Sequence, residues 1–441
     1  MPRLRPLLLA CTLSMVAAVG HAQSLQEVYE AARGYDAAYL AARALAESAQ
    51  YRSEQAYALR RPNLSATGNI TQSDTNPPPS AVNRGGDSYN NLVSGVTLTG
   101  RHPLFNRANG AIISQAERQL EQSRADLQTA EHELIVRTTQ LYFDVLVAQD
   151  ALAAAQANKK AVGEQLASAK RNFEVGTATI TDTREAQARF DLGTATEIAA
   201  ENDLRTKRIA LDQLVGRNNV TPRPLATPVA LPAVPGAVDE WVGQAQAGHP
   251  AVRRADLALD IARLETARAR AGHLPTIDAV ANLGTTRVSG GGPASIGTNT
   301  VANVGVQLNL PIFSGYSVQN RIRETLALEE RSRNDVDAAR RSVAQTTRVA
   351  YFGYQSGQAQ VAALEAAEAS SRLALEATQL GYRVGVRVNL DVLNAQTQLF
   401  NTQRDLSRAR YDVLLGGLRL RQAAGTLQPA DVNAVNTLLA R

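Results

Sequence analysis

The chain reads LGYRVGVRVNLDVLNAQ from residue 380 to residue 396, and a related stretch, FEVGTATITDTREAQ, occupies residues 173 to 187. Tyr382 lies 209 positions after Phe173, and the same spacing joins five further pairs, each of identical residues. These pairs are Val175 with Val384, Gly176 with Gly385, Asp182 with Asp391, Ala186 with Ala395 and Gln187 with Gln396. A spacing that stays constant over six positions indicates an internal duplication of the chain.

Gly176 and Gly385 each stand between two long stretches with helical periodicity. A glycine in such a place is typical of the left-handed residue that ends one helix before the chain doubles back. Polar residues suited to capping the returning helix follow at once: Thr179, Thr181, Asp182, Asn389 and Asp391. One glycine turn alone is common in helical proteins, whereas two copies at a fixed spacing predict two hairpins with their tips at one end.

The first 22 residues resemble a secretory leader. Arg3 and Arg5 precede an apolar run from 7 to 19, and small residues stand where a signal peptidase cuts, so we expect the mature chain to begin at Gln23. The chain's one cysteine, Cys11, lies in this leader. The sequence before Cys11 faintly resembles a lipoprotein cleavage box, but cleavage there would leave an apolar run of only about four residues.

Composition narrows the class of protein. A mature chain without cysteine excludes disulfides and cysteine-bound metals. After the leader, no apolar run approaches the roughly 18 to 20 residues of a membrane helix, so an exported chain of this kind is soluble outside the inner membrane or crosses an outer membrane as strands. The formal charge of +5 is weak and dispersed, and the leader carries two of these charges, which argues against nucleic acid as a partner.

The rest of the chain divides into two halves with the same order of elements. We predict a first repeat at 23–216, a proline-rich linker at 217–236, a second repeat at 237–425 and a C-terminal tail at 426–441. The first repeat should contain a helix at 24–59, a strand hairpin at 63–99, a helix at 108–172, a tip at 173–182 and a returning helix at 180–215. The corresponding elements of the second repeat are expected at 238–271, 276–310, 317–379, 382–391 and 389–424.

Lengths and periodicity indicate how the helices pack. Ile113, Leu120, Leu127, Leu134 and Leu141 recur every seven residues, as in helices that pack side by side in a coiled coil. A helix of about 66 residues is roughly 100 Å long, and two helices of about 36 residues placed end to end match it. Each half is therefore expected to be a rod with strands at one end and a tip at the other.

The four predicted strands each have one apolar face and about the length needed to cross a bilayer as a tilted strand. Four strands cannot close, and an open sheet in lipid leaves edge amides unpaired, so copies of the chain must complete a barrel. Two copies give eight strands with a filled interior, whereas three give twelve strands and room for a lumen. A soluble sandwich decorated with helices is the alternative that the strand pattern leaves open.

The order of elements and the tip residues resemble the TolC family of bacterial outer-membrane channels. The resemblance covers nearly all of the mature chain and is strongest over 173–182 and from 382 to the tail at 425–431. It implies a mainly α fold with a small β part. Long coiled-coil helices would form a trimeric α-barrel, and four strands per subunit would contribute to a twelve-stranded transmembrane β-barrel, with two internal structural repeats.

The resemblance also implies location and partners. It predicts a homotrimer in the outer membrane of a Gram-negative bacterium, in contact with outer-membrane lipid and extending into the periplasm. Such a duct carries small molecules or proteins out of the cell with a periplasmic adaptor protein and an inner-membrane transporter of the RND, ABC or MFS type. The sequence does not name the cargo or the transporter class.

Residues at the two tips correspond to the periplasmic gate of the family. Thr181 and Asp182 of the first tip would face Tyr382 and Arg387 of the second, and these links would hold the coils shut. Asp391 matches one member of a pair of acidic rings at the entrance. Asn394 occupies the position of the other member, which puts a double acidic ring, and with it cation selectivity, in doubt.

The adaptor docking points implied by the resemblance lie at the tips themselves. They are Val175, Gly176, Thr177, Val384, Gly385 and Val386. The first helix departs from the family pattern, because Gly34-Tyr35-Asp36 stands where the second copy has Gly248-His249-Pro250 and the family usually has Asn-Pro.

Neither an enzyme nor a periplasmic adaptor fits the sequence as well as a channel does. An enzyme is not indicated, because the histidines are scattered and the chain has no phosphate-binding glycine loop, nucleophile elbow or zinc motif, so no cofactor or metal is expected. A periplasmic adaptor also has long helical hairpins and strands and remains the alternative function. An adaptor usually carries one hairpin, whereas this chain has two hairpins and four evenly placed strands.

Overall fold

The computed structural model describes residues 22–76, 88–226, 231–233, 236–290 and 296–440. The predicted leader, with Cys11, lies outside the described residues except for Ala22. The chain forms two compact units. The tip unit comprises Met1–Leu40, Glu131–Trp241 and Thr347–Arg441, and the sheet unit comprises Ala41–Ala130 and Val242–Thr346. Each unit draws on both halves of the sequence.

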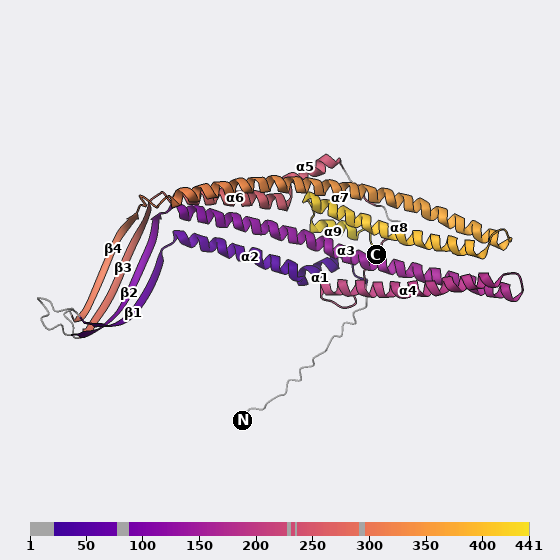
Figure 1. Ribbon diagram of the computed structural model, residues 1–441, viewed down its shortest axis with the longest axis horizontal. Coiled ribbons are helices and arrows are strands. Elements are labelled where there is room, and N and C mark those ends of the chain that lie inside the picture. Colours follow the sequence, from indigo (N-terminus) through magenta and orange to yellow (C-terminus); the bar gives the residue numbers. More distant parts are fainter. Residues whose placement is uncertain (1–21, 77–87, 227–230, 234–235, 291–295, 441) are drawn as a thin grey trace, which may run out of the picture. The chain divides into compact units, whose positions relative to one another are not determined.

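The sheet unit contains one antiparallel sheet, and its strands lie side by side in the order β1-β2-β3-β4 (Figure 1). The strands are β1 (Asn63–Thr75), β2 (Tyr89–Phe105), β3 (Thr276–Gly290) and β4 (Gly297–Asn309). The two predicted hairpins are joined by the pairing of β2 with β3, which extends from Asn91 opposite Gly290 to Phe105 opposite Ile277. Four antiparallel strands in a mainly helical chain are the fold class that the sequence predicted.

The two faces of the sheet differ in polarity, because residues directly opposite one another on paired strands share a face. One row across all four strands contains Ala66, Leu98, Leu283 and Ala302. The next row contains Ser65, Thr99, Asn282 and Asn303, and Asn282 donates to Asn303 at 3.0 Å. The sheet therefore has an apolar face and a polar face.

β2 is longer than the sequence predicted, because it continues past residue 99 to Phe105. Its register against β3 shifts between Pro103 and Phe105, as expected where proline cannot donate to the ladder. Before the shift, Arg101 donates to the carboxylate of Asp278 at 2.6 Å, and this bond joins β2 to β3 on the polar face. The Pro-Leu-Phe segment therefore ends the strand by a bulge and not by an abrupt stop.

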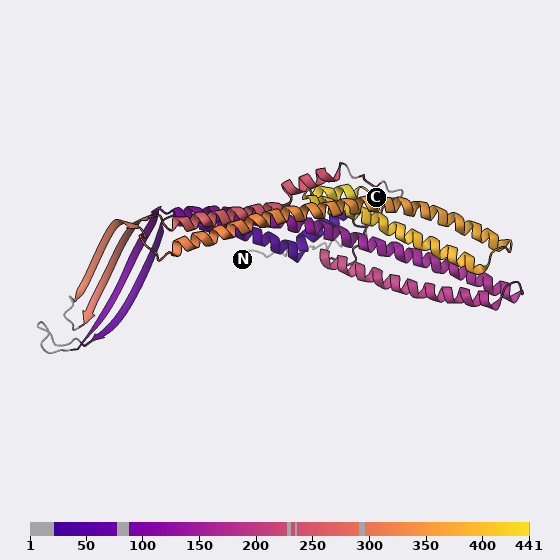
Figure 2. The same ribbon diagram turned by 45° about the horizontal axis from the view of Figure 1, so that its top comes forward.

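The long helices of the two halves match in length. α3 (Arg107–Glu174) has 68 residues and α7 (Ser317–Arg383) has 67, while the returning helices α4 (Ile180–Val215) and α8 (Asn389–Ala424) have 36 each. In the tip unit, α4 lies beside the end of α3 and α8 beside the end of α7, as both views show (Figure 2). The predicted internal repeat is thus present as two helical hairpins.

The segment predicted to be helical at 24–59 is helical but divided. The structure has α1 (Leu25–Tyr35), α2 (Ala37–Tyr57) and a short 3₁₀ turn, η1 (Ala58–Arg60), with the break at Asp36. The Asp36 carboxylate accepts from the backbone N–H of Tyr39 at 2.8 Å and pairs with Arg137 at 2.7 Å. Asp36 therefore caps α2, and this capping ends α1 one residue earlier.

The second half has the same break, where one helix was predicted at 238–271. α5 (Val238–Gly248) and α6 (Pro250–Ala271) meet at His249, whose Nδ1 accepts from the backbone N–H of Ala251 at 3.1 Å. Pro250 follows as the first helical residue, where its missing N–H costs nothing. The same break therefore uses an Asp cap in one half and a His-Pro cap in the other.

The described part of the proline-rich linker is bound into the tip unit. Tyr142 Oη donates to the carbonyl of Gln23 at 2.9 Å and accepts from the backbone N–H of Arg223 at 2.7 Å. A last helix, α9 (Pro429–Asn436), contacts α1 through Asn436, whose Oδ1 accepts from the backbone N–H of Leu25 at 3.1 Å. The linker therefore packs against α3, and the tail packs against α1.

Candidate functional site at the hairpin tips

The two tips have the same backbone geometry. In the first, the N–H groups of residues 175 to 178 donate to the carbonyls of Arg171, Phe173 and Asn172 at 2.8 to 3.1 Å. In the second, the N–H groups of residues 384 to 387 donate to the equivalent carbonyls 209 positions later at 2.9 to 3.2 Å. Gly176 and Gly385 have φ angles of 77° and 81°, in the left-handed region that glycine adopts without strain. The repeated sequence thus forms a repeated turn.

The caps of the two returning helices differ. Thr179 begins α4, and its Oγ1 accepts from the backbone N–H of Asp182 at 3.2 Å. The Asp182 carboxylate accepts in return from the Thr179 N–H at 3.0 Å and hydroxyl at 2.8 Å. Val388 occupies the equivalent place before α8 and has no side-chain cap. Asp182 is therefore engaged in its own helix turn, whereas Asp391 is not needed as a cap.

Asp391 pairs with a residue of its own tip. Arg387 Nη1 lies 3.6 Å from Asp391 Oδ2, and the side chains are 61% and 38% exposed, which makes the pair weak, at about 1 kcal/mol or less. Gly381 gives Arg387 its place, since a Cβ at residue 381 would lie 2.8 Å from Arg387 Cγ. This role of Gly381 could not be predicted from the sequence, because it depends on where the Arg387 side chain lies in the folded chain.

Polar contacts join the two hairpins. Asn172 Nδ2 donates to Tyr382 Oη at 3.3 Å, and Arg189 Nη2 donates to Asn394 Oδ1 at 2.9 Å. A third bond runs from Gln165 to the buried side chain of Asn389, whose own Nδ2 is buried without a partner among the described residues. No sequence signal marks Asn172, Gln165 or Arg189, because each partner lies more than 200 positions away.

An apolar cluster lies behind these contacts. Its buried members are Val162, Leu166, Ala169, Ala186 and Leu393, and Phe190 packs against it. Leu393 is fully buried although it belongs to the second hairpin and the other members to the first. The two hairpins are thus packed together by a small core just behind their tips.

The structure brings together only some of the predicted gate residues. Tyr382 reaches the first hairpin through Asn172, and Asn394 reaches it through Arg189. Among the described residues of a single chain, no hydrogen bond or ion pair joins Thr181 or Asp182 to Tyr382 or Arg387. The link between these four residues therefore stays a prediction.

The predicted docking residues form the exposed surface of both turns. Val175, Val384 and Val386 are 73%, 65% and 75% exposed. Nothing lies within 4 Å of the place where a Cβ would stand on Gly176 or Gly385. Thr177 is exposed as well, with its hydroxyl donating to the Asn172 carbonyl at 3.1 Å. Exposed valines beside two open glycines give each tip an apolar surface without bulky side chains.

Two further features concern the described residues, 22–76, 88–226, 231–233, 236–290 and 296–440. The helices there include none that is long and apolar enough to span a membrane. The same part of the chain contains no group of three or more His, Cys, Asp or Glu side chains arranged to hold a metal ion.

Comparisons with known proteins address the whole chain. The family model described as "Outer membrane efflux protein" matches residues 28–217 and 241–426. The chain is 32% identical to the outer membrane protein TolC of Vibrio cholerae over 99% of this chain and 98% of that protein. It is 33% identical to the alkaline protease secretion protein AprF of Pseudomonas aeruginosa over 79% of this chain and 72% of that protein.

A solved structure shows the same fold. The structure of CusC, whose description refers to transmembrane channel formation, matches with a TM-score of 0.78 at 18% identity, over 91% of this chain and 92% of that one. The match of the family model to both halves, and the relative that spans almost the full length, agree with the repeated hairpins and the four-stranded sheet. The chain belongs to the outer membrane efflux protein family, as its resemblance to the TolC channels predicted.

Proposed function

We propose that the chain is an outer-membrane exit duct, completed by identical copies of itself and gated at the two hairpin tips. The observation that carries this proposal is the sheet. It has one apolar face and one polar face, and among the described residues neither β1 nor β4 has a second strand beside it. Membership of the family gives the location, the outer membrane.

Copies of the chain are needed because unpaired strand edges in lipid cost several kcal/mol for each unsatisfied group. β1 and β4 each present an edge of 13 residues, so β4 of one copy can pair with β1 of the next. Three copies supply twelve strands, enough for a lumen lined by the polar face. A homotrimer is therefore the assembly that the sheet favours.

The gate would lie where the hairpins meet. Weak polar contacts between the tips suit a latch that must open, and the bond from Asn172 to Tyr382, which joins the two hairpins, is of this kind. Three-fold symmetry would gather three Asp391 carboxylates at the entrance, each beside Arg387 of its own tip, so the ring would attract cations where that weak pair opens. The predicted contacts of Thr181 and Asp182 with Tyr382 and Arg387 would then form when the coils close.

The partners would be a periplasmic adaptor and an inner-membrane transporter of the RND, ABC or MFS type. AprF is by its description a protein of alkaline protease secretion, and the family description speaks of efflux, so both small molecules and proteins fit as cargo. In this proposal the adaptor binds the apolar tip surface. The chain works as a channel and not as an enzyme.

The gate is tested in planar bilayers. Arg387→Gln or Tyr382→Phe should raise single-channel conductance, because losing a contact of up to about 1 kcal/mol shifts the open-to-closed ratio by up to about fivefold. Arg408→Gln is the matched control, since Arg408 and Asp412 form a pair of the same spacing at 3.7 Å on α8. If the two tip variants conduct no more than the Arg408→Gln control, Arg387 and Tyr382 are not part of the latch.

Docking is tested by cysteine crosslinking, which is clean because Cys11 is the chain's one cysteine and lies in the leader. Val175→Cys and Val384→Cys should crosslink to the adaptor. Val349→Cys on α7 should not, although Val349 and Val384 are equally exposed at 65%. If all three crosslink alike, the tips are not the docking surface.

The periplasmic adaptor remains the alternative function. It differs in assembly and location, because an adaptor needs no closed barrel. A trimer extracted from outer-membrane fractions that resists heating in gels fits the duct. A chain recovered without detergent as a monomer contradicts the duct.

A further inference from the structure

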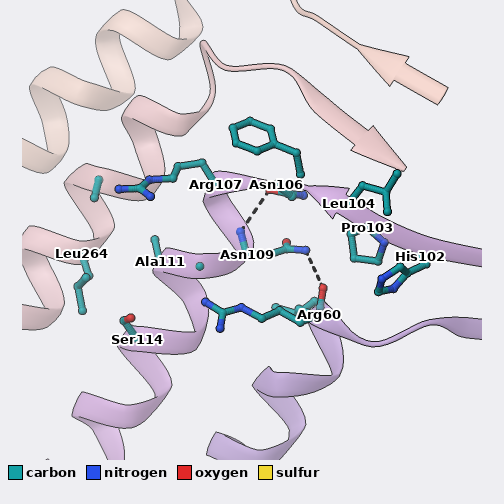
Figure 3. A pocket seen from close by; sticks show the side chains of 14 residues that line it. Arg60, His102, Pro103, Leu104, Asn106, Arg107, Asn109, Ala111, Ser114 and Leu264 are labelled. Atoms are coloured by element: carbon teal, nitrogen blue, oxygen red, sulfur yellow. Dashed lines mark hydrogen bonds between the residues drawn. The ribbon is translucent and has the colours of Figure 1, made fainter. Parts of the chain in front are cut away.

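The sheet unit contains a pocket of about 600 Å³ where β2 passes into α3 (Figure 3). Its walls come from the end of η1, the last residues of β2, the first turns of α3 and one face of α6. Apolar side chains on these walls include Leu59, Phe105 and Leu264. The contacts proposed above for the gate and for docking do not use this pocket, which lies in the other unit.

The pocket is basic. Arg60 and Arg107 line it, and no Asp or Glu does. Among the ion pairs of the described residues, none involves either arginine, although the chain has many other arginine–carboxylate pairs. Both arginines are exposed, and two guanidinium groups with no carboxylate among the lining residues produce a positive potential that favours an anion.

The frame that holds Arg60 in place is built from side chains of the pocket itself. Asn109 Nδ2 donates to the carbonyl of Leu59 at 2.9 Å and ties η1 to α3, and Asn106 Oδ1 accepts from the Asn109 N–H at 3.2 Å (Figure 3). Arg60 then lies over Gly110, where a Cβ would stand 3.9 Å from Arg60 Nη2. The backbone next to Arg60 is therefore held to α3, and the Arg60 side chain reaches the first turn of α3.

His102 lines the same pocket and has an unsatisfied ring nitrogen. Its Nδ1 is buried and has no hydrogen-bond partner among the described residues. Buried polar atoms are normally paired, and an exception calls for an explanation, such as a ligand that supplies the missing partner. A ligand oxygen would provide one after the His102 ring turns toward the pocket, because in this structure Nδ1 is closed to solvent.

The register shows which face of the sheet the pocket adjoins. His102 lies opposite Ala279 and in one row with Val306, and Phe105 lies opposite Ile277 and in one row with Leu308. Both lining residues are therefore on the apolar face of the sheet, at the end where the chain passes into helix. In the proposed duct this is the edge of the lipid-facing band on the periplasmic side.

We propose that this pocket binds the phosphate group of a membrane glycerophospholipid. Guanidinium groups match phosphate oxygens with paired charge-assisted hydrogen bonds, and basic pockets at a membrane edge hold lipid headgroups. Leu59, Phe105 and Leu264 offer an apolar surface for the first part of an acyl chain. The proposal rests on the placement of the sheet in the outer membrane and goes beyond transport, because it concerns a bound lipid of the duct wall.

The test is lipid retention by the detergent-purified full chain, measured by native mass spectrometry during titration with phosphatidylglycerol. Arg60→Gln/Arg107→Gln should raise the lipid concentration for half occupancy about tenfold or more, since hydrogen bonds to charged groups are lost. Arg61→Gln/Arg331→Gln removes the same charge from two exposed arginines outside the pocket and should change it little. Equal weakening in both double variants would overturn the proposal.

Two further measurements distinguish a lipid phosphate from free phosphate, and one of them does not depend on the folding of the double variant. Inorganic phosphate at millimolar concentration should not displace the lipid, and displacement would show that the pocket binds free phosphate. In the unaltered chain, a photoreactive phospholipid should label residues 59–60, 102–107 or 264–267. Labelling confined to the apolar strands would overturn the lipid site even if the double variant fails to assemble. Single-channel conductance reports on the duct separately.

Discussion

Arg189 of α4 donates a hydrogen bond to Asn394 of α8 at 2.9 Å, and this bond joins the two hairpins just behind their tips. Asn394 occupies the position where the family resemblance implies an acidic residue. A carboxylate there would meet the Arg189 guanidinium at once. In this chain that position carries an uncharged amide, which accepts from the Arg189 guanidinium and so links α4 to α8.

Asn394→Asp should convert the cross-link into an ion pair and raise the free energy of unfolding by up to about 1 kcal/mol, because the pair is exposed. The new carboxylate is neutralised by Arg189, so block of the channel by a multivalent cation should increase little. Asn394→Asp/Arg189→Gln should increase cation block clearly. The measurements are thermal unfolding and bilayer conductance, and equal block in the two variants contradicts this account.

Gly176→Ala and Gly385→Ala should each destabilise the tip unit by about 1 to 2 kcal/mol, the cost of a side chain in the left-handed region. Strain alone is responsible, because a Cβ at either position meets nothing within 4 Å. Gly353→Ala in α7 is the control, since it too meets nothing but is helical, and it should stabilise the chain slightly. Denaturant unfolding separates the three variants, and a loss for Gly353→Ala would argue against the strain explanation.

Leu393→Ala should cost about 2 to 5 kcal/mol, because it empties a fully buried site in the cluster that packs the hairpins together. The looser packing should also raise conductance. Leu373→Ala on α7 removes the same atoms from a side chain that is 66% exposed and should cost little. Stability is read by denaturant unfolding and gating by bilayer recording. If Leu393→Ala destabilises the chain but leaves gating unchanged, the packing of this cluster does not control the gate.

His132 should make the tip unit less stable in mild acid. Burial lowers the pKa of His132 in the folded chain, against the opposing effects of Glu131, Asp431 and a hydrogen bond to the Leu427 backbone. The unfolded chain has the ordinary pKa of about 6.5, so below that pH it binds more protons than the folded chain. The free energy of unfolding should therefore fall as the pH drops below about 6.5, until the folded-state pKa is passed.

Unfolding in denaturant between pH 7.5 and pH 5 measures this dependence. His132→Gln should remove much of the slope below pH 6.5. His273→Gln, which changes an exposed histidine, should leave it in place. Parallel pH profiles for all the chains would show that His132 is not the titrating group.

Much of the fold could be predicted because its signals are local. Alternation from residue 63 to residue 72 indicated β1, and the glycines of the two tips indicated the turns whose hydrogen bonds repeat 209 positions apart. The helix breaks could not be predicted equally well. Asp36 can lie within a helix or cap one, and its bond from the Tyr39 N–H, together with its pairing with the distant Arg137, is seen only in the structure.

The candidate site divides in the same way. Tyr382, Arg387 and Asp391 stand out in a repeated stretch, whereas Asn172, Arg189 and Gly381 carry no sequence signal. Asn172 and Arg189 are explained by hydrogen bonds to residues more than 200 positions away. Gly381 is explained by the Arg387 side chain, which a Cβ at residue 381 would meet. The basic pocket is of this kind as well, since Arg60, His102 and Arg107 come together only when η1, β2 and α3 meet.

The sequence by itself determined the duplication, the kinds of element and their order, because helical and strand periods, glycine turns and helix caps depend on neighbours within a few residues. Only the tertiary structure decided that β2 pairs with β3 across the two halves, that the hairpins share a core around Leu393, and that Asn394 bonds to Arg189. Those contacts join segments that are distant along the chain, and the free energy that selects them comes from burial and pairing in the folded state, which no local pattern records.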